Sequence, residues 1–207
     1  MTDQWCRSIC IIAEGNEEKY YLDRLISFNL FTNPYYSIDS IRNAYGINNV
    51  FPLFQNLYSS RRYNIIFIFC DGDNNSSQFQ NLVNKINHEL FGDNDVSSRV
   101  VVFVNPVTLQ VVLSHFDDVL LHHKGKTFNA PEVERLTGIT SYKAKEEQIK
   151  AMTKAIRFQS YQDMKDRISR LPQDINESPS TNFLGLLEML EGKAMDKMDE
   201  IIELLDK

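Results

Sequence analysis

The sequence predicts an α/β fold, in which a mostly parallel four-stranded sheet is flanked by helices and followed by an α-helical C-terminal third. Three observations lead to this prediction. Short apolar runs rich in β-branched residues do not alternate with polar residues, as expected of strands covered on both faces. Segments with helical spacing of apolar residues separate these runs. After Pro106 the strand pattern stops, and only helical patterns follow.

The first half of the chain alternates predicted strands and helices. The apolar runs that predict buried strands are residues 8–13, 64–70 and 99–104. A weaker candidate, residues 36–41, does alternate and is therefore expected at an edge of the sheet. Helical patterns occupy residues 17–28, 49–58 and 77–90. This alternating order favours parallel strands joined by right-handed crossovers.

The C-terminal part is predicted to be helical and to pack on the α/β part. Pro106 stands near the first turn of the first of these helices, where proline is tolerated. No linker rich in Gly, Ser or Pro separates the two parts, so we expect an α/β core over residues 1–123 and a helical extension over 124–207. The helical patterns are residues 107–121, 141–158, 162–171 and 181–206, the last interrupted at Gly192, with a loop or short helix at 125–140.

Composition excludes some classes of protein. The 207 residues include 22 Lys and Arg against 28 Asp and Glu, a net charge of −6, and 11% are aromatic. Plentiful aromatics and a small net charge exclude a disordered chain. The negative charge disfavours a stand-alone basic nucleic-acid binder. Residues 124–170, however, carry 11 basic and 6 acidic residues, a net +5. This region is either a solvated helix surface or the one phosphate-facing patch of the chain, with weak, salt-sensitive binding.

The sequence predicts a cytoplasmic protein without a membrane partner. It has no apolar run of 18 residues, and its first residues lack the basic flank and apolar stretch of a signal peptide. The three cysteines form no CxxC pair. Cys10 and Cys70 lie in apolar runs and are expected to be buried free thiols, which indicates a reducing compartment.

Acidic residues follow two of the predicted buried strands. Glu14, Glu17 and Glu18 come after the first apolar run, and Asp71 and Asp73 come after the second. Open α/β sheets bind ligands at the carboxyl ends of their strands. Carboxylates gathered there repel one another unless a cation offsets them, and Mg²⁺ or Mn²⁺ prefers such oxygen ligands. The alternative is that these residues are exposed loop acids and helix caps. Gly72, between the two aspartates, would let a ligand approach the backbone closely.

This arrangement resembles the Toprim catalytic domain, which is shared by topoisomerases, bacterial primases and the OLD nucleases. Residues 12–22 resemble the "EGxTExxYL" segment of the RloB-like branch, with Glu17 where Thr is usual. Residues 104–116 resemble its "SNPCFExWLLLHF" segment, and residues 178–181 resemble its "NPST" segment. The matches follow the family's order over residues 8 to about 190. One departure is that the family's "FE" falls on Thr108 and Leu109, so its acidic residue is missing.

The resemblance implies roles for individual residues. Glu14 would be the catalytic glutamate, as a metal ligand or a general acid and base. Asp71 and Asp73 would be catalytic residues that hold Mg²⁺ or Mn²⁺, and Glu18, one helical turn beyond Glu14, would be a further ligand. For Glu18 the alternative is an exposed residue in the first turn of a helix.

Further residues are expected around this site. Asn105, at the end of the third buried strand, could orient the substrate, and Lys143 and Lys145 are candidate phosphate contacts. His115 is expected to be structural, because it lies mid-helix beside Phe116. The pair at 122–123 is expected to be exposed at a helix end.

The resemblance implies a Mg²⁺-dependent nuclease that hydrolyses DNA or RNA, in bacterial anti-phage defence and often beside an ATPase partner. The missing acidic residue and the negative net charge support an alternative, a catalytically degenerate Toprim-like module that works with a partner such as an ATPase. A nucleotide-binding sheet is disfavoured, because neither Gly15 nor Gly72 lies in a glycine-rich loop. The apolar C-terminal helices, residues 183–205, are either core or a face for a homodimer or partner.

Overall fold

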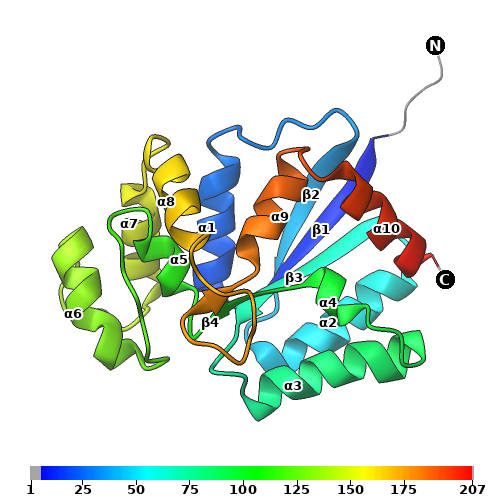
Figure 1. Cartoon of the computed structure of the whole chain (residues 1–207), viewed down its shortest axis with the longest axis horizontal. Helices are drawn as coiled ribbons and strands as arrows, with labels where there is room; N and C mark the ends of the chain where they lie inside the picture. Colours follow the sequence, from blue (N-terminus) through cyan, green and yellow to red (C-terminus); the bar gives the residue numbers. More distant parts are fainter. Residues whose placement is uncertain (1–5, 207) are drawn as a thin grey trace.

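The computed structural model describes residues 6–206, with the side chain of Lys126 excepted, and shows an α/β fold around one five-stranded sheet (Figure 1). The expectation about a signal peptide concerns residues that lie partly outside this range. The sheet order is β2-β1-β3-β4-β5. The first four of these strands pair in parallel and β5 pairs antiparallel with β4. The strands are β1 (Arg7–Ala13), β2 (Tyr36–Asn43), β3 (Ile65–Asp71), β4 (Val101–Asn105) and β5 (Ser180–Thr181).

The predicted fold class is confirmed, and the predicted strand number of four was wrong. The additional strand β5 is two residues long, too short to leave a periodic pattern. Side chains hold it in place: Thr181 Oγ1 donates a hydrogen bond to the Phe103 carbonyl (2.6 Å), and the Asn182 side chain accepts one from Phe103 N–H (2.8 Å). Since β5 comes from the predicted C-terminal extension, the two predicted parts share one sheet.

Helices cover both faces of the sheet. Phe183 of α9 stacks on Phe69 of β3 and contacts Tyr21 of α1, so α1 and α9 share one face. On the other face α2 contacts β1 and β3, and Phe79 of α3 meets Phe103 of β4 edge-on. The helices named here are α1 (Asn16–Ile26), α2 (Ile47–Ser59), α3 (Ser77–Asn84) and α9 (Phe183–Leu190). The π-helix η1 (Lys85–Leu90) and α4 (Ser97–Val100) follow α3 in the chain.

The remaining helices are placed at the two ends of the strands. The strands run toward the side of the molecule where α5, α6 and α7 lie, whereas α10 lies against their starting ends, where Asp199 pairs with Arg7 (Figure 1). None of the helices in residues 6–206 has both the length and the apolarity needed to cross a membrane. These helices are α5 (Leu109–Leu113), α6 (Lys126–Thr137), α7 (Glu146–Ala155), α8 (Ser160–Ile168) and α10 (Met195–Leu205).

Two local predictions differ from the structure. The helix predicted over 107–121 is confined to α5, because the buried side chain of Gln110 bonds the Val119 carbonyl (2.8 Å) and Leu121 N–H (2.8 Å) and so fixes the following segment in an irregular path. The third predicted buried strand begins at Val101 and not at residue 99, since residues 97–100 form the one-turn helix α4. Cys10 and Cys70 are buried free thiols, as expected.

Candidate functional site

The acidic residues predicted to form a site lie at the carboxyl ends of β1 and β3. These strands are neighbours, with Ala13 opposite Phe69, so the residues that follow them meet at one edge. Glu14 N–H donates to the Phe69 carbonyl (2.9 Å), and a Glu14 carboxylate oxygen accepts a hydrogen bond from Asp71 N–H (3.1 Å). Glu18 lies in the first turn of α1 and is buried. The fold therefore brings Glu14, Glu18 and Asp71 together from separate elements.

Each of these three carboxylates uses one oxygen in hydrogen bonds. Glu18 Oε2 accepts from Gly15 N–H (2.8 Å). Asp71 Oδ1 accepts from the Thr108 N–H (2.6 Å) and hydroxyl (2.8 Å). Within residues 6–206 no hydrogen bond reaches the other oxygens, Glu14 Oε1, Glu18 Oε1 and Asp71 Oδ2. No fully buried side-chain oxygen or nitrogen in this part of the chain lacks a partner, so each of these three oxygens keeps some exposed surface.

The carboxylates destabilise one another's charged forms. Burial, followed by the Glu18 carboxylate, raises the pKa of Glu14 to about 7, and Asp73 acts in the same direction. Burial, then Glu18 and Glu14, hold the pKa of Asp71 well above its usual value, although the Thr108 hydroxyl lowers it. No lysine or arginine is among the groups that mainly set these two pKa values. Burial and neighbouring carboxylates thus act together to raise the pKa values of Glu14 and Asp71.

Asp73 lies in a strained turn beside these residues. Asp73, Asn74 and Asn75 all have positive φ, 50°, 56° and 53°, in the left-handed region that non-glycine residues rarely adopt. Helix α3, which follows, is capped by Ser76, whose hydroxyl accepts from Phe79 N–H (3.2 Å). Neither Asp71 nor Asp73 is therefore the cap of α3, which was the structural alternative for the two aspartates.

Asn105 and Gly72 hold this turn in place. Asn105 is 1% exposed; its side-chain oxygen accepts from Asn74 N–H (2.7 Å), and its amide donates to the carbonyls of Ile175 (3.1 Å) and Glu177 (2.6 Å). These bonds give Asn105 a positioning role in the turn, and its predicted contact with substrate stays a prediction. A Cβ at Gly72 would lie 2.9 Å from Asn105 Cβ. Internal packing thus also favours glycine at this position, beside the expectation that it leaves room for a ligand.

Sequence reasoning missed a buried contact between the acidic edge and the C-terminal helices. The Tyr142 hydroxyl donates a hydrogen bond to Glu17, and both side chains are buried. Lys143 and Lys145 follow Tyr142 directly and are exposed, so this contact anchors the segment that carries both predicted phosphate contacts. The one feature of the sequence that could have indicated this contact is Glu17, which stands where the RloB-like segment has threonine.

His115 is structural, as expected. Its Nε2 lies 3.0 Å from the Tyr21 hydroxyl and its Nδ1 lies 2.9 Å from the Ser160 hydroxyl. Burial, and next the charge of Arg167, lower the pKa of His115 to about 3, so the ring is neutral. It joins α1 to α8 and does not reach the acidic edge.

The donor chemistry of the acidic edge suits a hard divalent cation, because Glu14, Glu18, Asp71 and Asp73 offer only carboxylate oxygens. As they stand, no three His, Cys, Asp or Glu side chains in residues 6–206 are arranged as a metal-binding group. Cation binding would therefore require these carboxylates to turn toward one another.

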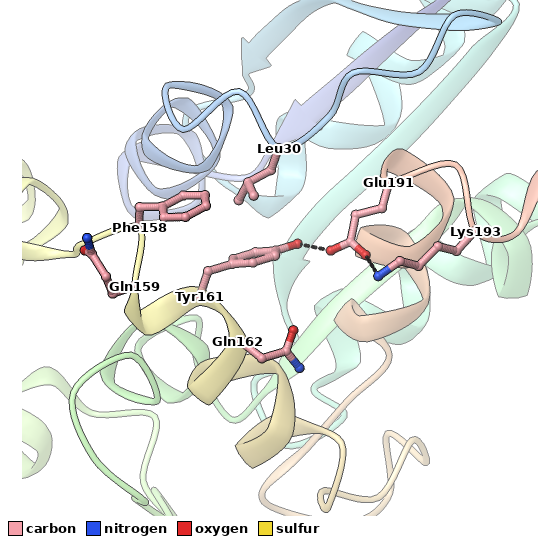
Figure 2. Close-up of a pocket in the computed structure, with 7 residues that line it drawn as sticks. All are labelled: Leu30, Phe158, Gln159, Tyr161, Gln162, Glu191 and Lys193. Atoms are coloured by element: carbon pink, nitrogen blue, oxygen red, sulfur yellow. Dashed lines mark hydrogen bonds and ion pairs between the residues drawn. The ribbon is translucent and has the colours of Figure 1, made fainter.

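A second carboxylate, Glu191, lines a hollow of about 420 Å³ away from this edge. Figure 2 shows Tyr161 and Lys193 pointing at Glu191, while Leu30 and Phe158 form an apolar side. The Tyr161 hydroxyl donates to Glu191 (2.5 Å), and Lys193 Nζ lies 2.6 Å from it. Lys165, buried behind, donates to both carboxylate oxygens (2.8 Å each).

Three comparisons with known proteins, by family models, curated sequences and solved structures, each found no match. The resemblance to the Toprim domain therefore rests on the motifs quoted above.

Proposed function

We propose that this chain is a Mg²⁺-dependent phosphodiesterase of Toprim type that hydrolyses DNA or RNA. The observation that carries the proposal is the gathering of Glu14, Glu18 and Asp71 at the carboxyl edge of β1 and β3, where burial and neighbouring carboxylates raise the pKa values of Glu14 and Asp71. The motifs of the RloB-like branch extend the proposal to anti-phage defence with an ATPase partner.

The roles follow from the environment of each carboxylate. Asp71, Glu18 and Asp73 would hold the cation, which offsets the negative charge of the scissile phosphate. In hydrolysis, water adds to phosphorus, a P–O ester bond breaks, and a proton passes from the water to the leaving oxygen. Glu14, whose pKa is raised to about 7 in the absence of a cation, would transfer that proton. Thr108 and Tyr142 keep Asp71 and Glu17 in place.

Cleavage assays with D71N test this proposal. Single-stranded and duplex DNA and RNA are incubated with Mg²⁺ or Mn²⁺, and Mn²⁺ binding is measured by titration calorimetry. We expect D71N to lose at least about 100-fold in cleavage rate, as expected when a group that stabilises transition-state charge is removed. The control is D196N, an exposed aspartate in α10 at the opposite ends of the strands. Unchanged cleavage in D71N would refute the proposal.

One observation favours the alternative, a catalytically degenerate module that works with a partner such as an ATPase. Thr108, which aligns with the family's "FE" segment, bonds Asp71 Oδ1 with both its N–H and its hydroxyl, so this oxygen is already occupied. In that case the calorimeter would record no binding of Mg²⁺ or Mn²⁺ to the wild type, and all substrates would stay intact.

A further inference from the structure

An exposed pair of aromatic rings lies at the start of α6: His123 precedes this helix and Phe128 lies in its first turn. The rings of His123 and Phe128 are stacked, with centroids 4.8 Å apart and an interplanar angle of 24°. Phe128 is 70% exposed, and His123 is exposed as well. An apolar ring so exposed is not explained by the packing of the core.

Hydrogen bonds hold the backbone that carries this pair. Asn129, which is 3% exposed, donates a side-chain hydrogen bond to the His123 carbonyl (2.7 Å). Phe128 N–H donates to the Gly125 carbonyl (3.0 Å), which closes the turn. A Cβ at Gly125 would lie 2.9 Å from the Phe128 ring, so glycine leaves room for the ring to fold back over the turn. The backbone therefore places the two rings against each other while they stay open to solvent.

Its electrostatic surroundings favour a negatively charged partner. His122, His123 and Lys124 are consecutive exposed residues beside the ring. They adjoin residues 124–170, which carry a net +5 in a chain whose total charge is −6. Rigid aromatic rings flanked by basic groups are how proteins bind single-stranded nucleic acid: bases stack on the rings and phosphates contact the cations.

We propose that His123 and Phe128 form a stacking platform for an unpaired base of single-stranded DNA or RNA, with Lys124 beside the adjacent phosphate. A base inside a duplex has both faces covered by its neighbours, so the platform selects unpaired segments. This inference rests on the proposed function and narrows it, because it names single strands as the substrate class.

Binding of a fluorescein-labelled dT12 or U12 oligonucleotide, followed by anisotropy in EDTA, tests the platform without metal or cleavage. We expect F128A to bind about 5- to 100-fold more weakly than the wild type, the loss typical of removing one base–aromatic stack. F128W, which keeps an aromatic ring at this position, should bind like the wild type. The matched control is F158A, a 52% exposed phenylalanine that packs against Phe28 and should bind like the wild type. A blunt duplex of the same length should bind weakly, and F128A should leave that binding unchanged.

The two proposals fail in different ways. If D71N abolishes cleavage while F128A binds oligonucleotides like the wild type, the platform is refuted and the proposed function stands. If F128A weakens binding but no metal binds and nothing is cleaved, the platform stands and the nuclease does not. The platform is also refuted if the wild type does not bind dT12 or U12, or if sedimentation shows a dimer that F128A dissociates, because Phe128 would then contact a second copy.

Discussion

Two buried carboxylate sites in this molecule are built in opposite ways. Burial alone would raise the pKa of Glu191, but hydrogen bonds from Lys165, Lys193 and Tyr161 lower it below its usual value. At the acidic edge, burial raises the pKa of Glu14 to about 7, and neighbouring carboxylates add to the shift. Glu191 thus has lysines as neighbours, whereas Glu14 has further carboxylates as neighbours.

This difference distinguishes a structural ion pair from the candidate functional site. Glu191 needs nothing from outside, since its lysines and tyrosine satisfy it and join α8 to the end of α9. The acidic edge lowers the stability of the metal-free protein, and such an arrangement is typical of sites that bind or react. The predictions below test this contrast.

The largest effect on stability is expected for K165M. The side chains of Lys165 and Glu191 are each only 9% exposed, and loss of Lys165 removes the buried cation that bonds both oxygens of Glu191, which leaves the exposed Lys193 as its remaining cation. We expect the free energy of unfolding to fall by about 3 kcal/mol or more, measured by urea denaturation at pH 7. The control is K193M: Lys193 also pairs with Glu191, but its side chain is 63% exposed, so its loss should cost about 1 kcal/mol or less. Equal effects of the two variants would contradict the assignment of Glu191 to a buried pair.

At the acidic edge, by contrast, removal of the charge in E14Q should raise the free energy of unfolding near pH 7. The pKa of Glu14 is raised from 4.5 to about 7 on folding, so between these values the folded state binds more protons than the unfolded state. In EDTA the wild type should therefore lose stability as pH rises from about 4.5 to 7. A shift of one pKa unit corresponds to about 1.4 kcal/mol, so the free energy of unfolding of the wild type should fall by about 3 kcal/mol over this range. E14Q should not show this fall.

Urea denaturation of both proteins across this pH range checks the prediction. E203Q, which changes an exposed glutamate of α10, serves as the control and should follow the wild type. Added Mg²⁺ should stabilise the wild type above pH 7 more than E14Q. Parallel pH profiles for wild type and E14Q would mean that Glu14 is ordinarily solvated.

The sequence predicted the acidic edge because simple topology creates it. The apolar runs of β1 and β3 identify buried parallel strands, and parallel neighbours bring their carboxyl ends to one edge. Glu14 and Asp71 could thus be placed together without knowledge of any side-chain contact. The edge strand β2 was likewise identified by its alternation. Signals of this kind are local and periodic.

The rest of the site depends on contacts between distant segments. Tyr142 meets Glu17 across 125 positions and Thr108 meets Asp71 across 37, and nothing local marks either partner. The strand β5 and the short helix α5 were mispredicted for the same reason, since Thr181 and Gln110 fix them through bonds to other segments. The apolar residues over 107–121 have helical spacing because this segment is buried, although most of it is irregular.

The smallest predicted effect concerns Thr108, which decides between an active and a degenerate site. T108V removes the hydroxyl donor to Asp71 (2.8 Å) but keeps the backbone N–H bond (2.6 Å). Because that hydroxyl favours the charged carboxylate, its loss should raise the pKa of Asp71 further and weaken Mn²⁺ binding about 5- to 10-fold, or about 1 kcal/mol. The control is T153V, where a buried hydroxyl bonds the Ile149 carbonyl (3.0 Å) in α7. If T108V instead tightens Mn²⁺ binding, the hydroxyl competes with the cation for Asp71, and Thr108 is the residue that closes a degenerate site.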